Sequence, residues 1–222
     1  MSFLSTAILI LKKDLMMEFK SRELILSTGM FSLLIVVLSA FSFDVNKIEP
    51  SLAASGAIWI AIALGGILAT ERLFNKEKEM NTWLAIVLSP SSRNGIFAGK
   101  FLSLSIFLII IMIFLLPIIK LFFGVEVNAP FYYLPLIMVL GITGFSSIGA
   151  LFGALIVKTS RREMVLGIVM LPLCAPVLIL SSKATLALLE TGTNLELNGY
   201  IKILGVLNII YLSIALWLFE YL

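Results

Sequence analysis

Six long stretches of uncharged, mostly apolar residues dominate this sequence, and short charged segments separate them. The runs are Leu24 to Phe43, Leu52 to Thr70, Phe101 to Ile119, Ala129 to Val157, Met164 to Ser182 and Ile203 to Phe219. Each is close to the roughly 20 residues that a helix needs to cross a bilayer. The apolar residues run continuously instead of alternating with period two, which excludes membrane strands. The pattern predicts an all-α, polytopic membrane protein with six transmembrane helices.

Composition agrees with that prediction. Hydrophobic residues make up 60% of the chain and charged residues only 13%, against about 25% charged residues in a soluble domain. The mean hydropathy is +1.12. Since crossing the membrane uses nearly all of the 222 residues, residues 1–222 are predicted to form a single transmembrane domain. The basic residues are divided among short loops with no aromatic-lined basic tract, so nucleic acid is not an expected partner.

The positions of lysine and arginine predict the orientation of the chain. Twelve of the 16 precede the first span or lie in the second and fourth connections between spans. Short loops rich in these residues stay in the cytoplasm. We therefore expect both termini, and the connection between spans two and three, on the cytoplasmic side of a multi-pass protein.

Residues 1–23 carry a helical pattern that is too polar to span. Its large apolar residues recur every three or four positions, at Leu4, Ile8, Leu11, Leu15 and Phe19. Lysines and Glu18 supply charge between them, which is typical of a helix in the membrane interface. We predict an interfacial elbow helix over 1–23; the alternative is a cytosolic extension of the first span. A short surface helix is also predicted in the polar segment Ala184 to Gly199.

Small residues and prolines mark spans four and five. Gly149 and Gly153 have the spacing that lets membrane helices approach closely. Packing within the chain is the favoured interpretation, and a homodimer seam or a translocation surface is the alternative. Pro172 and Pro176 should bend span five. Cys174 lies between them, and as the single cysteine it can form no intrachain disulfide.

The segment Glu71 to Lys100, here called the coupling loop, mixes both charge signs with large apolar residues. Such a loop would be explained if a separate ATPase docked on it. Aromatic anchors ringed by charges are usual at protein interfaces, so Phe74, Trp83, Leu84 and Leu88 would fill a groove on the partner. The rim contacts would come from Glu71, Arg72 and Lys78. The alternative is an amphipathic loop that lies on lipid with Trp83 as an interfacial anchor.

Several chemistries are excluded by residues that the sequence lacks. The chain contains no histidine, which rules out a histidine-based zinc protease, a histidine-liganded haem site and a Ser-His-Asp triad. The segment Gly95 to Phe101 is one residue too short for a phosphate-binding loop, and Phe101 stands where a magnesium ligand is needed. No charged residue lies in the middle of any apolar run, so ion-gradient coupling is not expected. We therefore predict a non-catalytic membrane subunit without a metal site.

A set of ordered motifs resembles one known family. They are Trp59-Ile60-Ala61, Ala69-Thr70-Glu71-Arg72-Leu73-Phe74, Leu88-Ser89-Pro90, Lys100, Arg161-Arg162, Leu171-Pro172-Leu173 and Pro176-Val177-Leu178-Ile179. Together they resemble CcmB, the membrane subunit of the haem exporter complex in cytochrome c maturation. The likeness covers nearly the whole chain, and the length and six spans match as well.

The resemblance implies an ABC transporter permease subunit in a bacterial inner membrane, with haem as possible cargo and no cofactor of its own. Its implied partners are the ATP-binding subunit CcmA, which would hold the ATP, then CcmC and CcmD, and the haem chaperone CcmE. The expected ATPase-interface residues are Glu71, Arg72, Phe74, Lys78, Trp83, Leu84, Leu88, Ser89 and Pro90. Two alternatives remain: a permease for a lipid or polysaccharide, or a membrane scaffold or enzyme without an ATPase.

Overall fold

The computed structural model contains seven helices and no strand in the residues that it describes, which are 2–43, 48–79, 92–126, 130, 132–157, 163–190 and 194–221. The helices are α1 (Phe3–Ser21), α2 (Glu23–Ser42), α3 (Pro50–Glu79), α5 (Arg93–Phe123), α6 (Tyr133–Val157), α7 (Glu163–Leu189) and α8 (Asn194–Glu220). All but α1 are long and apolar enough to cross a membrane. The predicted all-α fold with six spans is confirmed.

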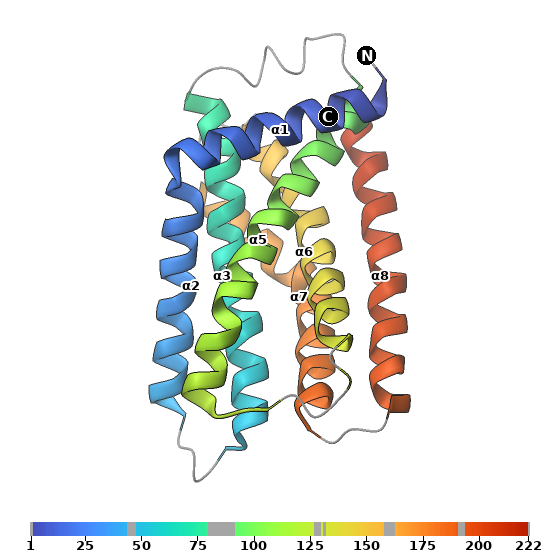
Figure 1. Cartoon of the computed structure of the whole chain (residues 1–222). Coiled ribbons are helices and arrows are strands. Elements are labelled where there is room, and N and C mark those ends of the chain that lie inside the picture. The colour runs from blue at the N-terminus through green and yellow to red at the C-terminus, as the bar shows by residue number, and fades with distance from the viewer. Residues whose placement is uncertain are drawn as a thin grey trace.

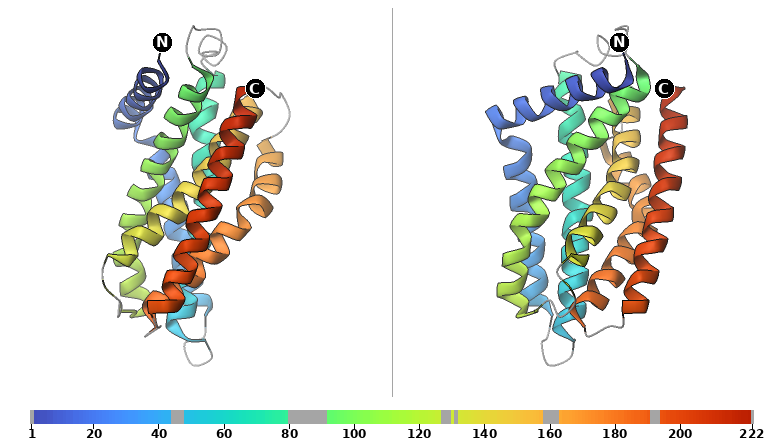
Figure 2. Two further views of the ribbon diagram at one scale, coloured as in Figure 1. Left: turned by 90° about the vertical axis from the view of Figure 1, so that its right-hand side faces the viewer. Right: turned by 45° about the vertical axis from the view of Figure 1, so that its right-hand side comes forward.

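The six spans form one bundle with α3 and α6 at its centre (Figure 1). In the most apolar window of these two helices, 67% and 72% of the residues are buried, against 22% for α2 and 17% for α8. Helices α2 and α8 therefore lie on the outside, where their apolar side chains face the surroundings of the bundle. Both chain termini lie at the same end of the bundle as α1 (Figure 2).

Helix α1 lies crosswise to the spans over one end of the bundle and packs along α5 (Figure 1). Its N-terminus is capped by the Ser2 side chain, and the helix ends at Arg22, whose φ of 53° is left-handed. This conformation ends α1 and turns the chain from the crosswise direction into the first span, α2. A continuous extension of the first span is therefore wrong, and α1 is a separate helix.

Two predicted helix ends and one predicted surface helix are wrong. Helix α3 continues past Thr70 to Glu79, and α5 begins at Arg93 instead of Phe101. Most of the coupling loop thus belongs to two long helices, because charged residues continue a helix well once it projects beyond the apolar layer. The surface helix predicted over Ala184 to Gly199 does not exist separately: residues 184–189 end α7, and residues 194–199 begin α8.

The glycines of α6 receive large side chains from neighbouring helices. A methyl group added at Gly141 would lie 2.2 Å from the Trp59 ring, and one added at Gly153 would lie 2.4 Å from the ring of Phe74. The space beside Gly149 is occupied in the same way by the side chains of Leu104 and Thr70. Packing within the chain is therefore confirmed for this glycine-rich face, which leaves no room there for a second copy.

Helix α7 runs without interruption through both of its prolines and bends along its length (Figure 2). The Tyr211 hydroxyl of α8 donates to the Leu173 carbonyl at 2.9 Å, within the segment where proline removes helical donors. Cys174 is fully buried here, as expected of a small core residue.

Candidate functional site: a buried charge cluster

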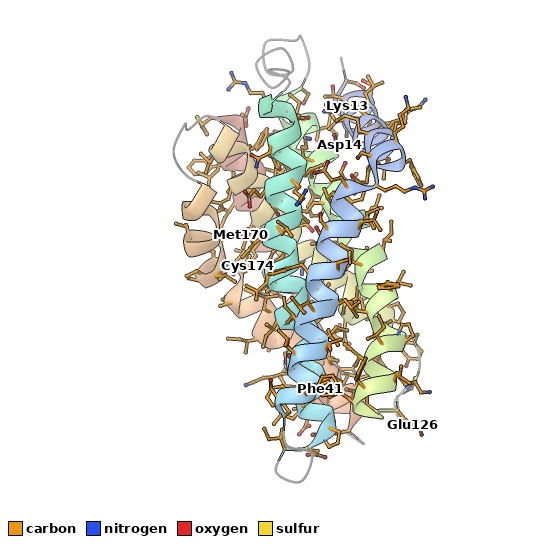
Figure 3. The ribbon with its side chains drawn as sticks, turned by 90° about the vertical axis from the view of Figure 1, so that its left-hand side faces the viewer. Lys13, Asp14, Phe41, Glu126, Met170 and Cys174 are labelled. Carbon is orange, nitrogen blue, oxygen red and sulfur yellow. The ribbon has the colours of Figure 1, made fainter. Side chains whose placement is uncertain are left out.

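Four charged side chains from three helices meet beneath α1. Lys13 and Asp14 come from α1, Glu77 from the last turns of α3, and Lys100 from the second turn of α5. Figure 3 labels the two α1 residues where that helix meets the top of the bundle. We call these four residues the charge cluster. Its two lysines and two carboxylates balance in formal charge.

Lys100 is at the centre of the cluster. Its Nζ lies 3.1 Å from Asp14 Oδ2 and 2.7 Å from Glu77 Oε1. The residue is 0% exposed, so its ammonium group has lost its hydration and depends on these partners. The ring of Phe74 lies 5.1 Å from Nζ and adds a cation–π contact.

Lys13 closes the cluster on its outer side. Its Nζ lies 3.3 Å from Asp14 Oδ1 and also pairs with Glu77. Burial alone would lower the pKa of Lys13, but the attraction of Asp14 and Glu77 and their hydrogen bonds outweigh it, so the pKa is raised above its ordinary value. Lys13 therefore stays charged, and each carboxylate is shared by two cations.

A buried cluster of this kind holds helices in register more than it adds net stability. Removing charges from water is costly, and their mutual attraction repays the cost only in good geometry. Removing one partner leaves the opposite charge buried without compensation, which costs about 3–5 kcal/mol. The cluster therefore fixes α1, α3 and α5 relative to one another as long as all four members are present.

The crossing of α1 over α5 is made possible by two glycines. A methyl group added at Gly95 would lie 2.8 Å from the Phe3 carbonyl, and one added at Gly99 would lie 2.6 Å from Ile10 Cβ. Only residues without a side chain allow the backbones to come this close. This contact places Asp14 over Lys100, one residue beyond the second glycine.

Glu18 fixes the turn between α1 and α2. Its buried carboxylate accepts the Ile25 backbone N–H at 2.8 Å, which satisfies one of the free donors in the first turn of α2 and places a negative charge at the positive end of the helix dipole. Nearby, Arg72 of α3 pairs with Glu23 of α2 at 2.7 Å. The C-terminal end of α1 is thus tied to α2, and the start of α2 is tied to α3.

The expected interface residues fall into two groups. Glu71 and Arg72 are half-buried on α3, and the backbone of Lys78 continues that helix. Phe74 is only 1% exposed, so the expectation of an exposed anchor there is corrected: its ring packs against Gly153 and Lys100. Five further residues lie outside the described part of the chain: Trp83, Leu84, Leu88, Ser89 and Pro90.

Sequence reasoning missed the charge cluster, although two signals pointed to it. Beside the apolar stripe of α1, a second stripe at the same helical spacing contains two apolar and two acidic residues, Ala7, Ile10, Asp14 and Glu18, and all four are buried. Gly95 and Gly99, in the segment whose likeness to a phosphate-binding loop was rejected, have the spacing of a close helix crossing. Both patterns together predict the packing of α1 on α5.

Comparison with known proteins identifies similar chains. The family described as "CcmB protein" matches residues 5–220. Heme exporter protein B of Haemophilus influenzae is 28% identical over 200 residues, covering 90% of this chain and 89% of that protein. Heme exporter protein B of Pseudomonas aeruginosa is 30% identical over 160 residues, covering 72% of this chain and 70% of that protein.

Proposed function

Since this chain belongs to the CcmB family, we propose that it is the membrane subunit of a haem-export complex in a bacterial inner membrane, driven by a separate ATPase. The names of its relatives support haem export, and the absence of a phosphate-binding loop supports a separate source of energy. The partner would be an ATP-binding subunit of the CcmA type, with CcmC, CcmD and the haem chaperone CcmE in the same complex.

The observation that carries the coupling part of this proposal is the position of the charge cluster. Glu77 precedes the end of α3 by two residues, and Lys100 lies within two turns of the start of α5. Residues 80–91, which connect these two helices, are therefore bounded on both sides by helices that the cluster joins to each other and to α1.

This arrangement suits the transmission of movement. A partner that binds residues 80–91 would displace the ends of α3 and α5, and the cluster would carry the displacement to α1. Because unpairing a buried lysine is costly, the three helix ends would move as one unit. The docking contacts in this proposal are Trp83, Leu84 and Leu88, with Ser89 and Pro90 shaping the connection and Glu71, Arg72 and Lys78 at its margin.

The orientation in this proposal places both termini and α1 on the cytoplasmic side. The large apolar residues of α1 that face away from the bundle would then lie in the membrane interface: Leu4, Ile8 and Phe19 are 68%, 61% and 76% exposed. A helix with such an exposed apolar stripe is typical of the interface plane.

The proposal is tested by affinity purification of the tagged chain from gently solubilised native membranes, followed by mass spectrometry. Co-purification of an ATP-binding subunit together with haem-handling proteins is the expected result. An ATPase without haem-handling proteins would point to another cargo, such as a lipid or polysaccharide. No ATPase at all would overturn the coupling proposal.

A variant then tests the docking contacts. Changing both Trp83 and Leu88 to Asp should release the ATPase, because each variant side chain would carry a charge at the proposed apolar contact. Both positions lie between the second and third apolar runs of the sequence, so we expect membrane insertion to remain intact. The matched control is Lys12→Asp with Lys20→Asp, two exposed positions on α1, which should leave the ATPase bound. Retention of the ATPase by the first variant would contradict docking on residues 80–91.

A further inference from the structure

A groove runs along the bundle between α3 and α7, in the half that lies away from α1. Its volume is about 680 Å³. The two helices lie beside each other (Figure 3). From α3 the groove is lined by Gly56, Trp59, Ile60, Ala63 and Leu64, and from α7 by Leu171, Pro172, Ala175, Leu178, Ile179, Ser182 and Lys183. Its lining belongs entirely to membrane-spanning segments.

Small residues leave the groove open, and the side chain of Trp59 forms part of its wall. Gly56 of α3 and Ala175 of α7 both line it with little or no side chain, and a methyl group added at Gly56 meets no atom within 4 Å. The Trp59 ring is buried and held in place by a hydrogen bond from its Nε1 to Thr185 Oγ1 at 2.9 Å. The groove is therefore a fixed feature of the packing of these two helices.

The sides of the groove are open to the surroundings of the bundle. Ile60 is 50% exposed and Ile179 is 56% exposed. In a membrane such residues face lipid tails, so an acyl chain can enter from the side without displacing water.

A single cation, Lys183, lies at the end of the groove farthest from α1. It is exposed and lies six residues before the end of α7, which at 1.5 Å per residue puts it about 9 Å inside the helix end. Within the part of the chain that the structure describes, it makes no ion pair. A lysine at this depth extends its ammonium group toward the headgroups, where it attracts anionic lipid.

We propose that the α3–α7 groove binds one anionic phospholipid, with an acyl chain against Trp59 and Gly56 and the phosphate at Lys183. The apolar lining matches the chain, the lateral opening matches its route of entry, and the unpaired cation matches the headgroup. This site is separate from the charge cluster and does not depend on the proposed coupling to an ATPase.

The test is to count the lipids that remain bound to the purified full chain by native mass spectrometry, with phosphatidylglycerol or phosphatidylcholine added. Wild-type protein should retain one phosphatidylglycerol in preference to phosphatidylcholine. Lys183→Gln should weaken phosphatidylglycerol binding about fivefold, the factor that one lysine near the membrane surface contributes. Lys202→Gln removes an exposed lysine of α8 and should have no such effect.

A second pair of variants tests the apolar part of the groove. Gly56→Phe should fill part of the groove and abolish retention of the lipid, and a Cβ added at this position meets no atom within 4 Å. Gly29→Phe is the matched control on α2, where an added Cβ also meets no atom within 4 Å and the residue lies outside the groove. Circular dichroism establishes that each variant is folded.

Three outcomes would overturn the proposal. Equal retention in wild type and Gly56→Phe would place the lipid elsewhere. Equal affinity for the two lipids would remove the role of Lys183. Displacement of phosphatidylglycerol by stoichiometric haemin in wild type, but not in Gly56→Phe, would assign the groove to haem instead of lipid.

Discussion

Lys100 of α5 and Asp14 of α1 are 86 residues apart in the chain, yet their charged atoms lie 3.1 Å apart with both residues buried. A pair this far apart in sequence forms only when α1 lies over α5, and the glycines of α5 allow that contact. The charge cluster therefore depends on the tertiary packing of α1 at the end of the bundle where α3 and α5 are connected.

Removing the central cation should be strongly destabilising. Lys100→Met leaves Asp14 and Glu77 buried with only Lys13 beside them, and we expect a loss of about 3–5 kcal/mol in unfolding free energy. Thermal unfolding in detergent measures the effect. Lys120→Met, at an exposed lysine near the other end of the same helix, should change stability little, and an equal loss in both variants would contradict the role given to the cluster.

Exchanging the charges of Asp14 and Lys100 separates the energy of their mutual interaction from the effect of each side chain alone. The double variant Asp14→Lys with Lys100→Asp restores two cations and two carboxylates to the cluster but places the new lysine beside Lys13 and the new aspartate beside Glu77. It should therefore be less stable than wild type and more stable than the less stable of its two single variants. Double-mutant analysis of the four proteins gives the interaction energy. Additive losses in the double variant would show that the two side chains do not act on each other.

The close crossing of α1 and α5 should not tolerate a side chain at Gly99. Gly99→Val would place Cβ 2.9 Å from the Ala7 carbonyl and 2.6 Å from Ile10 Cβ, and since the backbone atom cannot rotate away, we expect α1 to separate from α5. Hydrogen exchange of residues 3–21 should rise in this variant. Gly205→Val, where an added side chain meets nothing, is the control, and unchanged protection of α1 in Gly99→Val would be inconsistent with this contact.

A polar contact inside the membrane region holds the outer helix α8 on α6. Asn208 Nδ2 donates to the Leu140 carbonyl at 2.9 Å, and its Oδ1 accepts from the Thr143 hydroxyl at 2.8 Å. Asn208→Leu should cost about 1–2 kcal/mol, the range of interhelical hydrogen bonds in membranes. Thermal unfolding measures the cost, and Thr143→Val in the Asn208→Leu background should add little if the two residues act as a pair.

The spans could be predicted from the sequence because an apolar run of sufficient length has few alternatives in a membrane. The helix ends could not: α3 extends to Glu79 and α5 starts at Arg93, since hydropathy reports where the apolar layer ends and not where the helix ends. Phe74 was misplaced for this reason, because a residue assumed to lie in a loop is part of a packed helix.

Sequence reasoning missed the charge cluster for a different reason. Asp14 and Glu77 each have charged neighbours in sequence, which is typical of solvated segments, and Lys100 directly precedes an apolar run, where a lysine commonly marks the membrane surface. Their burial depends on three helices meeting, and only tertiary structure brings these residues together. The glycines of α6 were easier to interpret, since close packing is the commonest use of small residues in membrane helices.

The most direct test of coupling through the charge cluster is an electron-paramagnetic-resonance distance between spin labels in the complex with its ATPase. The labels replace Lys12 on α1 and Lys202 on α8, both exposed, in a Cys174→Ser background. ATP binding is predicted to change this distance in the otherwise wild-type chain, and Glu77→Gln should abolish the change while the ATPase stays bound. A distance that ATP leaves unaltered, or alters equally in Glu77→Gln, would contradict transmission through the cluster.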